Sequence, residues 1–472
     1  MAVVIGCDSF LALRNVRNGN LGERLAGSRV VALVDPHQYA GAVQTAPSGV
    51  EIGCLLEFDP RRDPPLYRLM ERTYYARKCY YDPATQWQDF RKSSTTANLT
   101  NPLRRRASLA RAAMRMAGYW AAGRLGQAQA GRRALMAALS AHPIMADYER
   151  LLRDLDARVV VSFSQDGWRE MALMAAARRL SIPTILMIRS RDNLAAKIMH
   201  LPDADAYLVW AETTREFLCH MYPELRGKPI HVTGSPQFDR HLNPAYRLSR
   251  DAFFQHVGLD PARPLIVYTT ATPGLIRHEI HIVQHLADAL RDGTFVRGAQ
   301  MLVRGHPRGF GANVPLLHHT YPGVAIYPPP TSYPVNSPEH EANVIRLILE
   351  DEPLHLATLA YQDVQVNISG TMFVDSAILD KPSVGIYYDL PAETPAGLSA
   401  RRYYDRSDMR PIVASGGVRL AHTPDQAIAQ INAYLENPSL DAAGRRTIRE
   451  REAGRLDGSA GERIARIIGS YL

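Results

Sequence analysis

The stretch that decides the fold is VNISGTMFVDSA, residues 366–377. An apolar strand is expected over Val364–Ile368 and a helix over Met372–Leu379, with only Ser369-Gly370-Thr371 between them. A strand that turns through glycine straight into a helix is typical of a doubly wound α/β sheet. The sequence therefore predicts such a sheet around this stretch.

The same turn has the chemistry of an anion site. The free N–H groups and the dipole at a helix N-terminus attract phosphate, and Gly370 offers only its backbone to a ligand. Ser369 or Thr371 can also simply cap the helix. Asp375 lies about one turn into the helix, where its carboxylate could meet a ribose hydroxyl.

Short apolar runs recur along the chain and alternate with helical patterns. A first series of strands is expected at Val3–Ile5, Val30–Val34, Ile52–Leu56, Val159–Phe163, Thr184–Ile188, Ala206–Trp210 and Ile230–Thr233. A second series is expected at Leu265–Thr269, Gln300–Val303, Val324–Tyr327, Val364–Ile368 and Ser383–Tyr387. Further helices are expected at Trp168–Leu180, Glu212–Met221, His278–Arg291, His340–Leu349 and Pro424–Leu435. Such runs favour parallel strands buried on both faces, so we expect an α/β protein with two Rossmann-type domains and a facing cleft.

The expected domains cover residues 1–240 and 241–445, with terminal helices over 446–472 that pack back on the first domain. A segment rich in Ala, Leu, Met and Arg, about residues 91–156, interrupts the first series of strands. This composition favours helix, so the segment is expected to be a helical insertion. Its glycines predict two or more helices rather than one rod; they are Gly118, Gly123, Gly126 and Gly131.

Positive charge is concentrated in that insertion. The chain has 55 Lys and Arg against 47 Asp and Glu, a formal charge of +8. Ten basic residues and no acidic residue lie between Arg91 and Ala146, which leaves −2 for the rest of the chain. The segment therefore predicts a localised anionic partner, such as a membrane surface that meets Arg104-Arg105-Arg106. A solvated Arg-rich helix face is the alternative interpretation.

Composition also argues against several classes of protein. No apolar run approaches the roughly 18 residues that span a bilayer, and Met1–Phe10 does not resemble a signal peptide. The four cysteines form no CxxC pair, which argues against a disulfide framework or zinc site. We therefore expect a cytoplasmic protein, with peripheral attachment to the inner face of the membrane as a further expectation. Nucleic acid is not an expected partner, because only Tyr119 and Trp120 are aromatic within the basic segment.

Polar residues follow the first two strands of the second series. Thr270 and Thr272 come after one strand, in a loop whose backbone N–H groups could bind phosphate. Arg304-Gly305-His306-Pro307-Arg308 closes the next strand. Two guanidiniums beside an imidazole suit the phosphates of a nucleotide, because His306 can donate a proton to a leaving oxygen. The alternative is a loop whose arginines only meet solvent.

A metal site is not favoured by the sequence. His278, His281 and His285 share one helical face, but the chain has no HExxH motif and no paired acidic ligand there. A polar helix face is the simpler interpretation. No cofactor is expected beyond a nucleotide-activated substrate.

The first series of strands carries two candidate motifs. Asp166, in Gln165-Asp166-Gly167, follows a strand and precedes a helix, where it could act as a general base or as a helix cap. Arg189, Arg191, Asp192 and Asn193 follow the next strand and could bind an acceptor. The alternative for them is a surface loop held by its own Asx hydrogen bonds.

At these motifs the chain resembles GT-B glycosyltransferases, over roughly residues 159–472. It is most similar to the bacterial CDP-glycerol glycerophosphotransferase and capsule or surface polysaccharide biosynthesis family. The matching motifs are Asp192-Asn193-Leu194, Gly234-Ser235-Pro236 with Asp239, His306-Pro307, Ser369-Gly370-Thr371 followed by Lys381-Pro382, and Asp457–Ile464. GT-B sialyltransferases share an acidic-acidic-Gly motif, from which Gln165-Asp166-Gly167 departs at its first position.

The resemblance implies a glycosyltransferase that moves a sugar or polyol phosphate from a nucleotide-activated donor. Asp166 would activate the acceptor hydroxyl, and His306 would contact the donor phosphate. The donor site would comprise Thr270, Thr272, Arg304, Arg308, Ser369, Gly370, Thr371 and Asp375. The first domain would bind a glycan or lipid-linked acceptor through Arg189, Arg191, Asp192 and Asn193. A cytidine nucleotide and metal-independent inverting transfer are expected, with UDP donors left open.

Two alternatives remain beside this interpretation. A sugar-nucleotide 2-epimerase of the same fold would need several carboxylates in its cleft, and the sequence offers only Asp166, Asp192 and Asp239. A nucleic-acid-binding protein is suggested by the basic segment alone.

Overall fold

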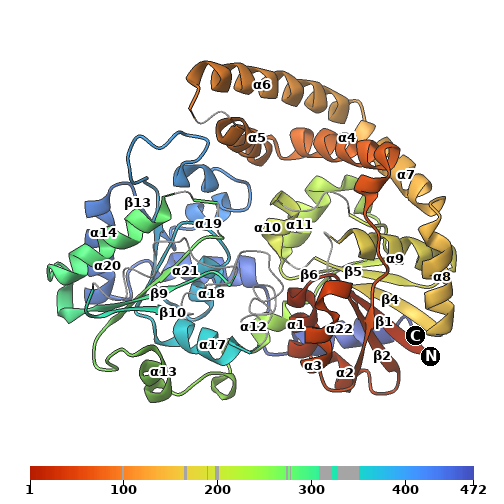
Figure 1. Cartoon of the computed structure of the whole chain (residues 1–472). Helices are drawn as coiled ribbons and strands as arrows, with labels where there is room; N and C mark the ends of the chain where they lie inside the picture. Colours follow the sequence, from red (N-terminus) through yellow and green to blue (C-terminus); the bar gives the residue numbers. More distant parts are fainter. Residues whose placement is uncertain are drawn as a thin grey trace. The chain divides into compact units, whose positions relative to one another are not determined.

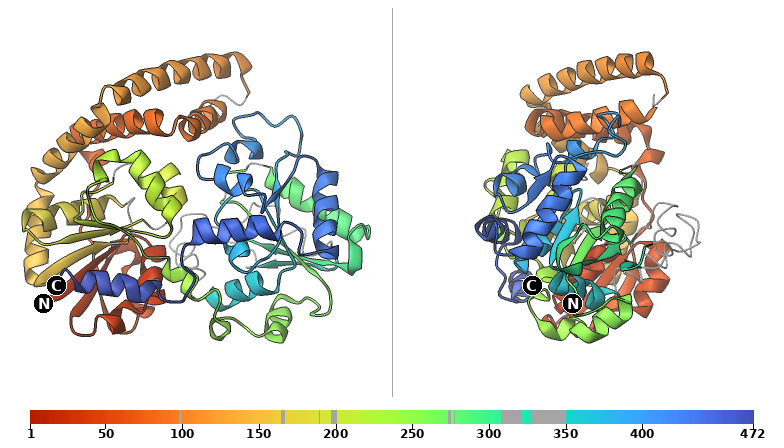
Figure 2. Two further views of the ribbon diagram at one scale, coloured as in Figure 1. Left: turned by 180° about the vertical axis from the view of Figure 1, so that it is seen from behind. Right: turned by 90° about the vertical axis from the view of Figure 1, so that its left-hand side faces the viewer.

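The computed structural model describes residues 1–97, 100–163, 167–188, 190–196, 201–272, 275–276, 278–307, 321–327 and 350–472. The side chains of Arg191 and Ala196 are outside this description. The chain forms two compact units (Figures 1 and 2). The first unit contains residues 1–87, 111–240 and 451–472, and the second contains residues 88–110 and 241–450.

The first unit is built on a seven-stranded parallel sheet in the order β3-β2-β1-β4-β5-β6-β7. Its strands are β1 (Ala2–Cys7), β2 (Arg29–Val34), β3 (Val50–Cys54), β4 (Ala157–Ser162), β5 (Thr184–Met187), β6 (Ala206–Val209) and β7 (Ile230–Val232). Helices associated with them are α1 (Phe10–Asn18), α2 (Leu21–Arg24), α3 (Tyr39–Gln44), α9 (Trp168–Arg179), α10 (Arg191–Ala196), α11 (Glu212–Met221) and α12 (Pro236–Asp239). The central strands β1 and β4 are buried almost throughout, as their continuous apolar sequences predict.

The second unit is built on a six-stranded parallel sheet in the order β10-β9-β8-β11-β12-β13. Its strands are β8 (Leu265–Thr269), β9 (Gln300–Arg304), β10 (Val324–Tyr327), β11 (Val364–Asn367), β12 (Ser383–Ile386) and β13 (Arg419–Ala421). Its helices are α13 (Arg250–Val257), α14 (Glu279–Arg291), α17 (Glu352–Tyr361), α18 (Met372–Ile378), α19 (Arg410–Ala414), α20 (Pro424–Glu436) and α21 (Ala442–Ile448).

Strand β8 shows why both faces of this sheet need cover. Ile266 and Tyr268 enter one core together with α14 and α20. Leu265 and Val267 enter a second core with α13 and α17. Successive side chains of a strand point to opposite faces, so a wholly apolar strand requires helices on both. The predicted α/β class and the doubly wound sheets are confirmed.

A group of long helices lies between β3 and β4 in the chain. They are α4 (Pro64–Tyr81), α5 (Pro83–Ala97), α6 (Pro102–Arg124), α7 (Gln127–Ser140) and α8 (Ile144–Asp154). The helical segment thus begins at Pro64, earlier than the composition indicates. The contacts of this group place residues 88–110 in the second unit and residues from Arg111 onward in the first. Within the described residues, no helix is both long enough and apolar enough to cross a membrane.

The helical segment contains more than one helix, as its glycines predict. Gly126, at φ 77°, stands between α6 and α7. Gly123 lies inside α6, where an added Cβ would overlap the Ala76 carbonyl of α4. Gly131 lies inside α7, where a Cβ would overlap the Thr73 side chain of α4. These two glycines therefore allow helices to approach closely and do not mark helix ends.

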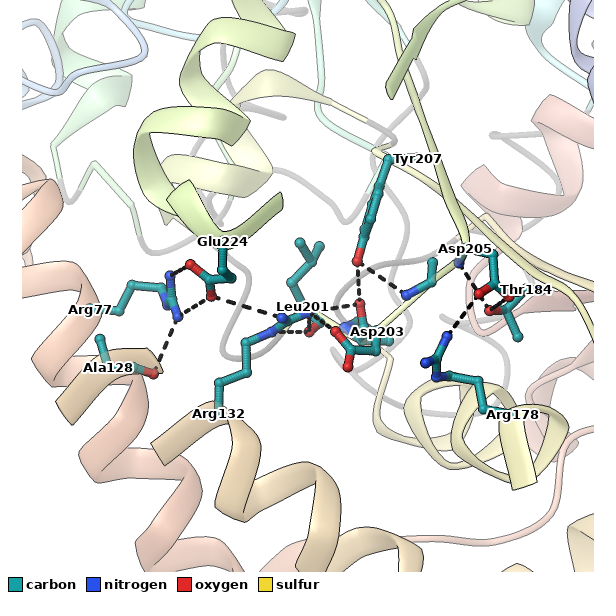
Figure 3. A network of polar contacts seen from close by, with 12 residues as sticks. Arg77, Ala128, Arg132, Arg178, Thr184, Leu201, Asp203, Asp205, Tyr207 and Glu224 are labelled. Atoms are coloured by element: carbon teal, nitrogen blue, oxygen red, sulfur yellow. Dashed lines mark hydrogen bonds and ion pairs between the residues drawn. The ribbon is translucent and has the colours of Figure 1, made fainter. Parts of the chain in front are cut away.

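Two buried arginines join this helical group to the sheet-bearing part of the first unit (Figure 3). Arg77 of α4 donates to the Met221 carbonyl at 2.6 Å and pairs with Glu224 at 2.7 Å. Arg132 of α7 donates to the Leu201 carbonyl at 3.2 Å and pairs with Asp203 at 2.6 Å. Arg132 is one of the ten basic residues of the basic segment, so one positive charge of that segment is paired inside the fold.

The C-terminal segment completes the first unit. Helix α22 (Ala460–Gly469) contacts α2 and α12. Both carboxylate oxygens of Asp239 accept hydrogen bonds from the first N–H groups of α22, those of Ala460 and Gly461, at 3.1 Å. An added Cβ at Gly461 would overlap the backbone of Gly19. The segment is therefore fixed by close backbone packing and by a carboxylate cap supplied from far away in the sequence.

Candidate functional site

The order of the strands locates the candidate site of the second unit. Numbered within the unit, the order β10-β9-β8-β11-β12-β13 is 3-2-1-4-5-6. Ligands of such sheets bind beyond the carboxyl ends of the strands, where the order reverses. Here the reversal lies between β8 and β11. The loops after β8, β9 and β11 therefore meet at one edge, and these loops carry the predicted donor residues.

His306 is held by the two predicted threonines. The Thr270 hydroxyl accepts a hydrogen bond from the backbone N–H of His306 at 2.9 Å. The Thr272 hydroxyl lies 3.2 Å from Nε2 of the same imidazole. The Thr270 N–H in turn bonds to the Arg304 carbonyl at 3.0 Å. The backbone and ring of His306 are thus fixed together, while all three side chains remain partly exposed.

Glu279 adjoins this arrangement and was missed at the level of sequence. It is the first residue of α14, and its carboxylate accepts hydrogen bonds from the Ala271 N–H at 2.9 Å and the Tyr268 hydroxyl at 3.2 Å. Burial raises its pKa to about 7, although both hydrogen bonds act in the opposite direction. The sequence signal that could have identified Glu279 is its position as an acidic residue at the start of the helix that follows a candidate loop.

The Ser369-Gly370-Thr371 turn presents backbone donors rather than side-chain caps. Gly370 has φ 135°, a conformation that strains any residue with a Cβ. Thr371 occupies the N-cap position of α18 without making a side-chain cap, and its carbonyl receives the N–H groups of Val374 and Asp375. The N–H groups at the start of an α-helix have no intrahelical acceptor. The expected side-chain cap by Thr371 is therefore absent, and the helix start is open to an acceptor.

Two predicted donor residues are engaged inside the fold. The Arg304 guanidinium is buried, forms an ion pair with Asp351, and approaches the Thr358 hydroxyl at 3.4 Å. Asp375 is also buried and lies 2.9 Å from Nε2 of His241. A phosphate at Arg304 or a ribose at Asp375 would have to share these contacts.

Other predicted residues fall outside the described part of the chain. These are Asp166, Arg189 and Arg308, together with the side chain of Arg191. Asp192 accepts a hydrogen bond from the Ser190 hydroxyl at the start of α10. Asn193 is buried. The acceptor role remains a prediction, whereas the surface-loop alternative is wrong for residues 191–196, which form α10.

The first unit places a pair of acidic residues at its own reversal of strand order, between β1 and β4. Glu170 is fully buried and accepts hydrogen bonds from the Asp8 N–H at 2.5 Å and from the Ser162 hydroxyl. An added Cβ at Gly167 would overlap the Asp8 carboxylate. The backbone directly after Asp166 therefore lies beside Asp8. The available signal for Asp8 was its position directly after β1.

An open cavity of about 420 Å³ adjoins Asp8. It is lined by Asp8, His37, Glu57, Phe58, Asp59, Arg61, Arg62, Trp168 and Arg169. Arg169 bridges three carboxylates, those of Asp8, Asp35 and Glu57, at 2.9–3.4 Å. Arg61 lies over the Trp168 ring at 5.1 Å. An aromatic ring among charged hydrogen-bonding groups is a surface suited to a polar ligand such as a sugar.

Asp239, one of the carboxylates considered for epimerase chemistry, has a structural role as the cap of α22. Its neighbour Gly234, at φ 77°, packs against the Arg455 carbonyl, and Arg463 donates to the Thr233 carbonyl at 2.7 Å. Burial raises the pKa of Asp239. The backbone at the start of the Gly-Ser-Pro motif therefore packs against the C-terminal segment. Among the described residues, no group of three His, Cys, Asp or Glu side chains could hold a metal ion.

Comparison with solved structures identifies the fold. The UDP-GlcNAc 2-epimerase of Neisseria meningitidis, bound to UDP-GlcNAc, matches with a TM-score of 0.53 and 11% identity over 99% of each chain. The fold is of the GT-B type. The UDP-GlcNAc 2-epimerase of Methanocaldococcus jannaschii matches at 0.51 and 11% identity, again over 99% of each chain.

The match to a member of the family expected from the motifs is weaker. The wall teichoic acid polymerase TagF, with CDPG, gives a TM-score of 0.43 and 13% identity over 66% of this chain and 72% of that chain. No family model matches the sequence, and no curated protein matches it. The comparisons therefore establish the fold, and function rests on the sites.

Proposed function

We propose that the protein is a nucleotide-sugar-dependent glycosyltransferase whose second unit binds the nucleotide. The observation that carries the proposal is His306, held by Thr270 and Thr272 at the strand-end edge from which α18 also begins, where the strand order reverses. An imidazole and backbone N–H groups at one edge can bind a diphosphate or monophosphate together. The UDP-GlcNAc of the Neisseria meningitidis structure is a ligand of this class.

The proposed reaction is a single displacement with inversion at the sugar. The acceptor hydroxyl oxygen forms a bond to the anomeric carbon while the bond from that carbon to the phosphate oxygen breaks. Asp166 takes the hydroxyl proton, and His306 donates a hydrogen bond to the departing phosphate. The acceptor is a glycan or lipid-linked saccharide, and the cavity beside Asp8 is where its sugar would bind in the first unit. A cytidine nucleotide is the proposed donor.

Charge on the departing phosphate is balanced in this proposal by His306 and helix N–H groups. Transfer would then continue in EDTA. Loss of turnover in EDTA with recovery on adding Mg²⁺ would contradict this part of the proposal.

Nucleotide binding can be measured by the shift in thermal unfolding with CMP, CDP, UDP and GDP. A ligand at 100 times its Kd adds about 2.7 kcal/mol to the free energy of unfolding. We expect one of these nucleotides to stabilise the wild type. The substitutions His306→Ala and Thr272→Val should reduce this thermal shift. The control His256→Ala, at an exposed position, should leave the shift unchanged. Equal shifts for wild type and His306→Ala would refute the site.

A sugar-nucleotide 2-epimerase is the second candidate, and one observation favours it. The structure sets the Glu170 carboxylate against the Asp8 N–H and the Asp8 carboxylate against Gly167, whereas the sequence alone offered no such group. Incubation with a CMP-sugar and with a UDP-sugar separates the candidates. Release of the free nucleotide only when an acceptor is present supports transfer, while the C2 epimer of the UDP-sugar appearing without acceptor supports epimerisation and overturns transfer.

A further inference from the structure

Helix α6 carries large apolar side chains on its outer surface. Leu103, Met114 and Leu125 are 75%, 67% and 78% exposed. Leu125 follows the helix directly and continues its hydrogen bonding, because its N–H bonds to the Ala121 carbonyl at 3.0 Å. Burying such side chains in an apolar environment is favourable, so three of them exposed along one helix point to a partner.

Their spacing places them in one row. Eleven residues separate Leu103 from Met114, and eleven more separate Met114 from Leu125. At about 100° per residue, eleven residues make three turns plus about 20°, so the three side chains lie within about 40°. Smaller residues complete a row that we name the outer stripe; it comprises Leu103, Ala107, Ala110, Met114, Ala117, Ala121 and Leu125.

The opposite side of α6 faces the protein. Ala112 and Gly123 are its buried residues, and both lie about 180° from the outer stripe. Tyr119 stacks on Tyr75 of α4 at 5.1 Å, so this side packs against α4. Figures 1 and 2 show α6 running alongside α4. The outer stripe is thus the side turned away from α4.

Arginines border the outer stripe on both sides. By the same helical rotation, Arg106 and Arg124 lie about 60° to one side, and Arg104, Arg111 and Arg115 about 80–120° to the other. No acidic residue occurs between Arg91 and Ala146 to offset them. An apolar row between two rows of arginine is the pattern of a helix that lies in a membrane interface, where the guanidiniums reach lipid phosphates.

We propose that the outer stripe of α6 docks on an anionic lipid bilayer, with the flanking arginines on the headgroups. The apolar row distinguishes this partner from nucleic acid, whose phosphate backbone offers nothing to Leu103, Met114 and Leu125. The proposal does not depend on the proposed function. It assigns the positive segment of the chain to a membrane-facing surface.

The test is flotation of the full chain with phosphatidylglycerol-containing vesicles and with pure phosphatidylcholine vesicles. We expect binding only to the anionic vesicles, weakened by salt. Substitution of three large residues of the stripe by serine should lower binding at least tenfold; the variant is Leu103→Ser, Met114→Ser, Leu125→Ser. All three are exposed, so the unfolding temperature should not change. The matched control is Val43→Ser, an apolar residue of α3 that is 48% exposed.

A second variant tests the charges. Each arginine near an anionic surface contributes about fivefold to binding, so three substitutions should cost about 100-fold; the variant is Arg104→Gln, Arg106→Gln, Arg111→Gln. The control of equal charge uses exposed arginines elsewhere and should bind as wild type; it is Arg24→Gln, Arg226→Gln, Arg446→Gln.

Three outcomes would overturn the proposal. The first is wild-type vesicle binding by the serine variant, the second is no binding to anionic vesicles at all, and the third is binding to random-sequence RNA in place of vesicles. The nucleotide-dependent thermal shift should be the same in every α6 variant, so failure here is distinguishable from failure of the proposed function.

Discussion

Glu279 makes the stability of the second unit depend on pH in a calculable way. Its pKa is raised from 4.5 to about 7, so the unfolded chain loses this proton at lower pH than the folded unit does. Between these values the folded state holds the extra proton, and stability falls as pH rises. Integrating the two titrations gives a cost of about 0.8 kcal/mol at pH 5 and about 3.3 kcal/mol at pH 8.

The perturbation is Glu279→Gln, which cannot titrate and keeps an acceptor for the Ala271 N–H. Whatever this substitution costs by itself, its effect relative to wild type should become more favourable by about 2.5 kcal/mol between pH 5 and pH 8. All other titrating groups are common to both proteins, so they cancel in the comparison.

The two units can be followed separately because all four tryptophans, Trp87, Trp120, Trp168 and Trp210, belong to the first unit. Urea unfolding followed by far-ultraviolet circular dichroism reports both units, and tryptophan fluorescence reports the first. We expect the pH effect in the unfolding transition of the second unit, which circular dichroism detects and tryptophan fluorescence does not. If the free energies of unfolding of the wild type and Glu279→Gln changed with pH in parallel, the conclusion that Glu279 is a buried carboxyl with a raised pKa would be refuted.

Three other substitutions test packing that the structure shows. Asp239→Ala removes the acceptor for two N–H groups of α22 and should destabilise the first unit by about 1–2 kcal/mol, read by tryptophan fluorescence; an unchanged midpoint would contradict the cap. Gly167→Ala pushes a methyl group against Asp8 and should cost about 1–3 kcal/mol in the same assay. Asp351→Ala leaves the buried guanidinium of Arg304 without its ion-pair partner and should destabilise the second unit by about 3–5 kcal/mol. The double substitution Arg304→Met, Asp351→Leu should recover most of this loss. A small effect of Asp351→Ala alone would show that the Arg304 guanidinium is solvated and not buried.

The sequence predicted the sheets because their central strands are continuous apolar runs. Strand β13 (Arg419–Ala421) was missed, since it is short, two of its three residues are partly exposed, and it forms no such run. The glycines predicted more than one helix in the helical group, but not that Gly123 and Gly131 serve packing against α4. Such contacts join residues about 50 positions apart, and local propensity carries no information about them.

The candidate site was predictable where it depends on strand ends and unpredictable where it depends on distant partners. Thr270 and His306 follow neighbouring strands, so the topology alone brings them together. Arg304 resembles a phosphate ligand in sequence, but Asp351 neutralises it from 47 positions away. Asp375 is engaged in the same way by His241, 134 positions away.

The capping of α22 by Asp239 has a kinetic consequence. The first unit includes residues 1–87 as well as residues 451–472, so it cannot be completed during synthesis until residues 451–472 have emerged from the ribosome. The second unit, made from residues 88–110 and 241–450, has all its parts earlier. Closing a loop of 221 residues between Asp239 and Ala460 is slow compared with local folding. During synthesis the surfaces of α2 and α12 that α22 covers stay exposed, and at this stage the nascent protein depends most on protection from aggregation.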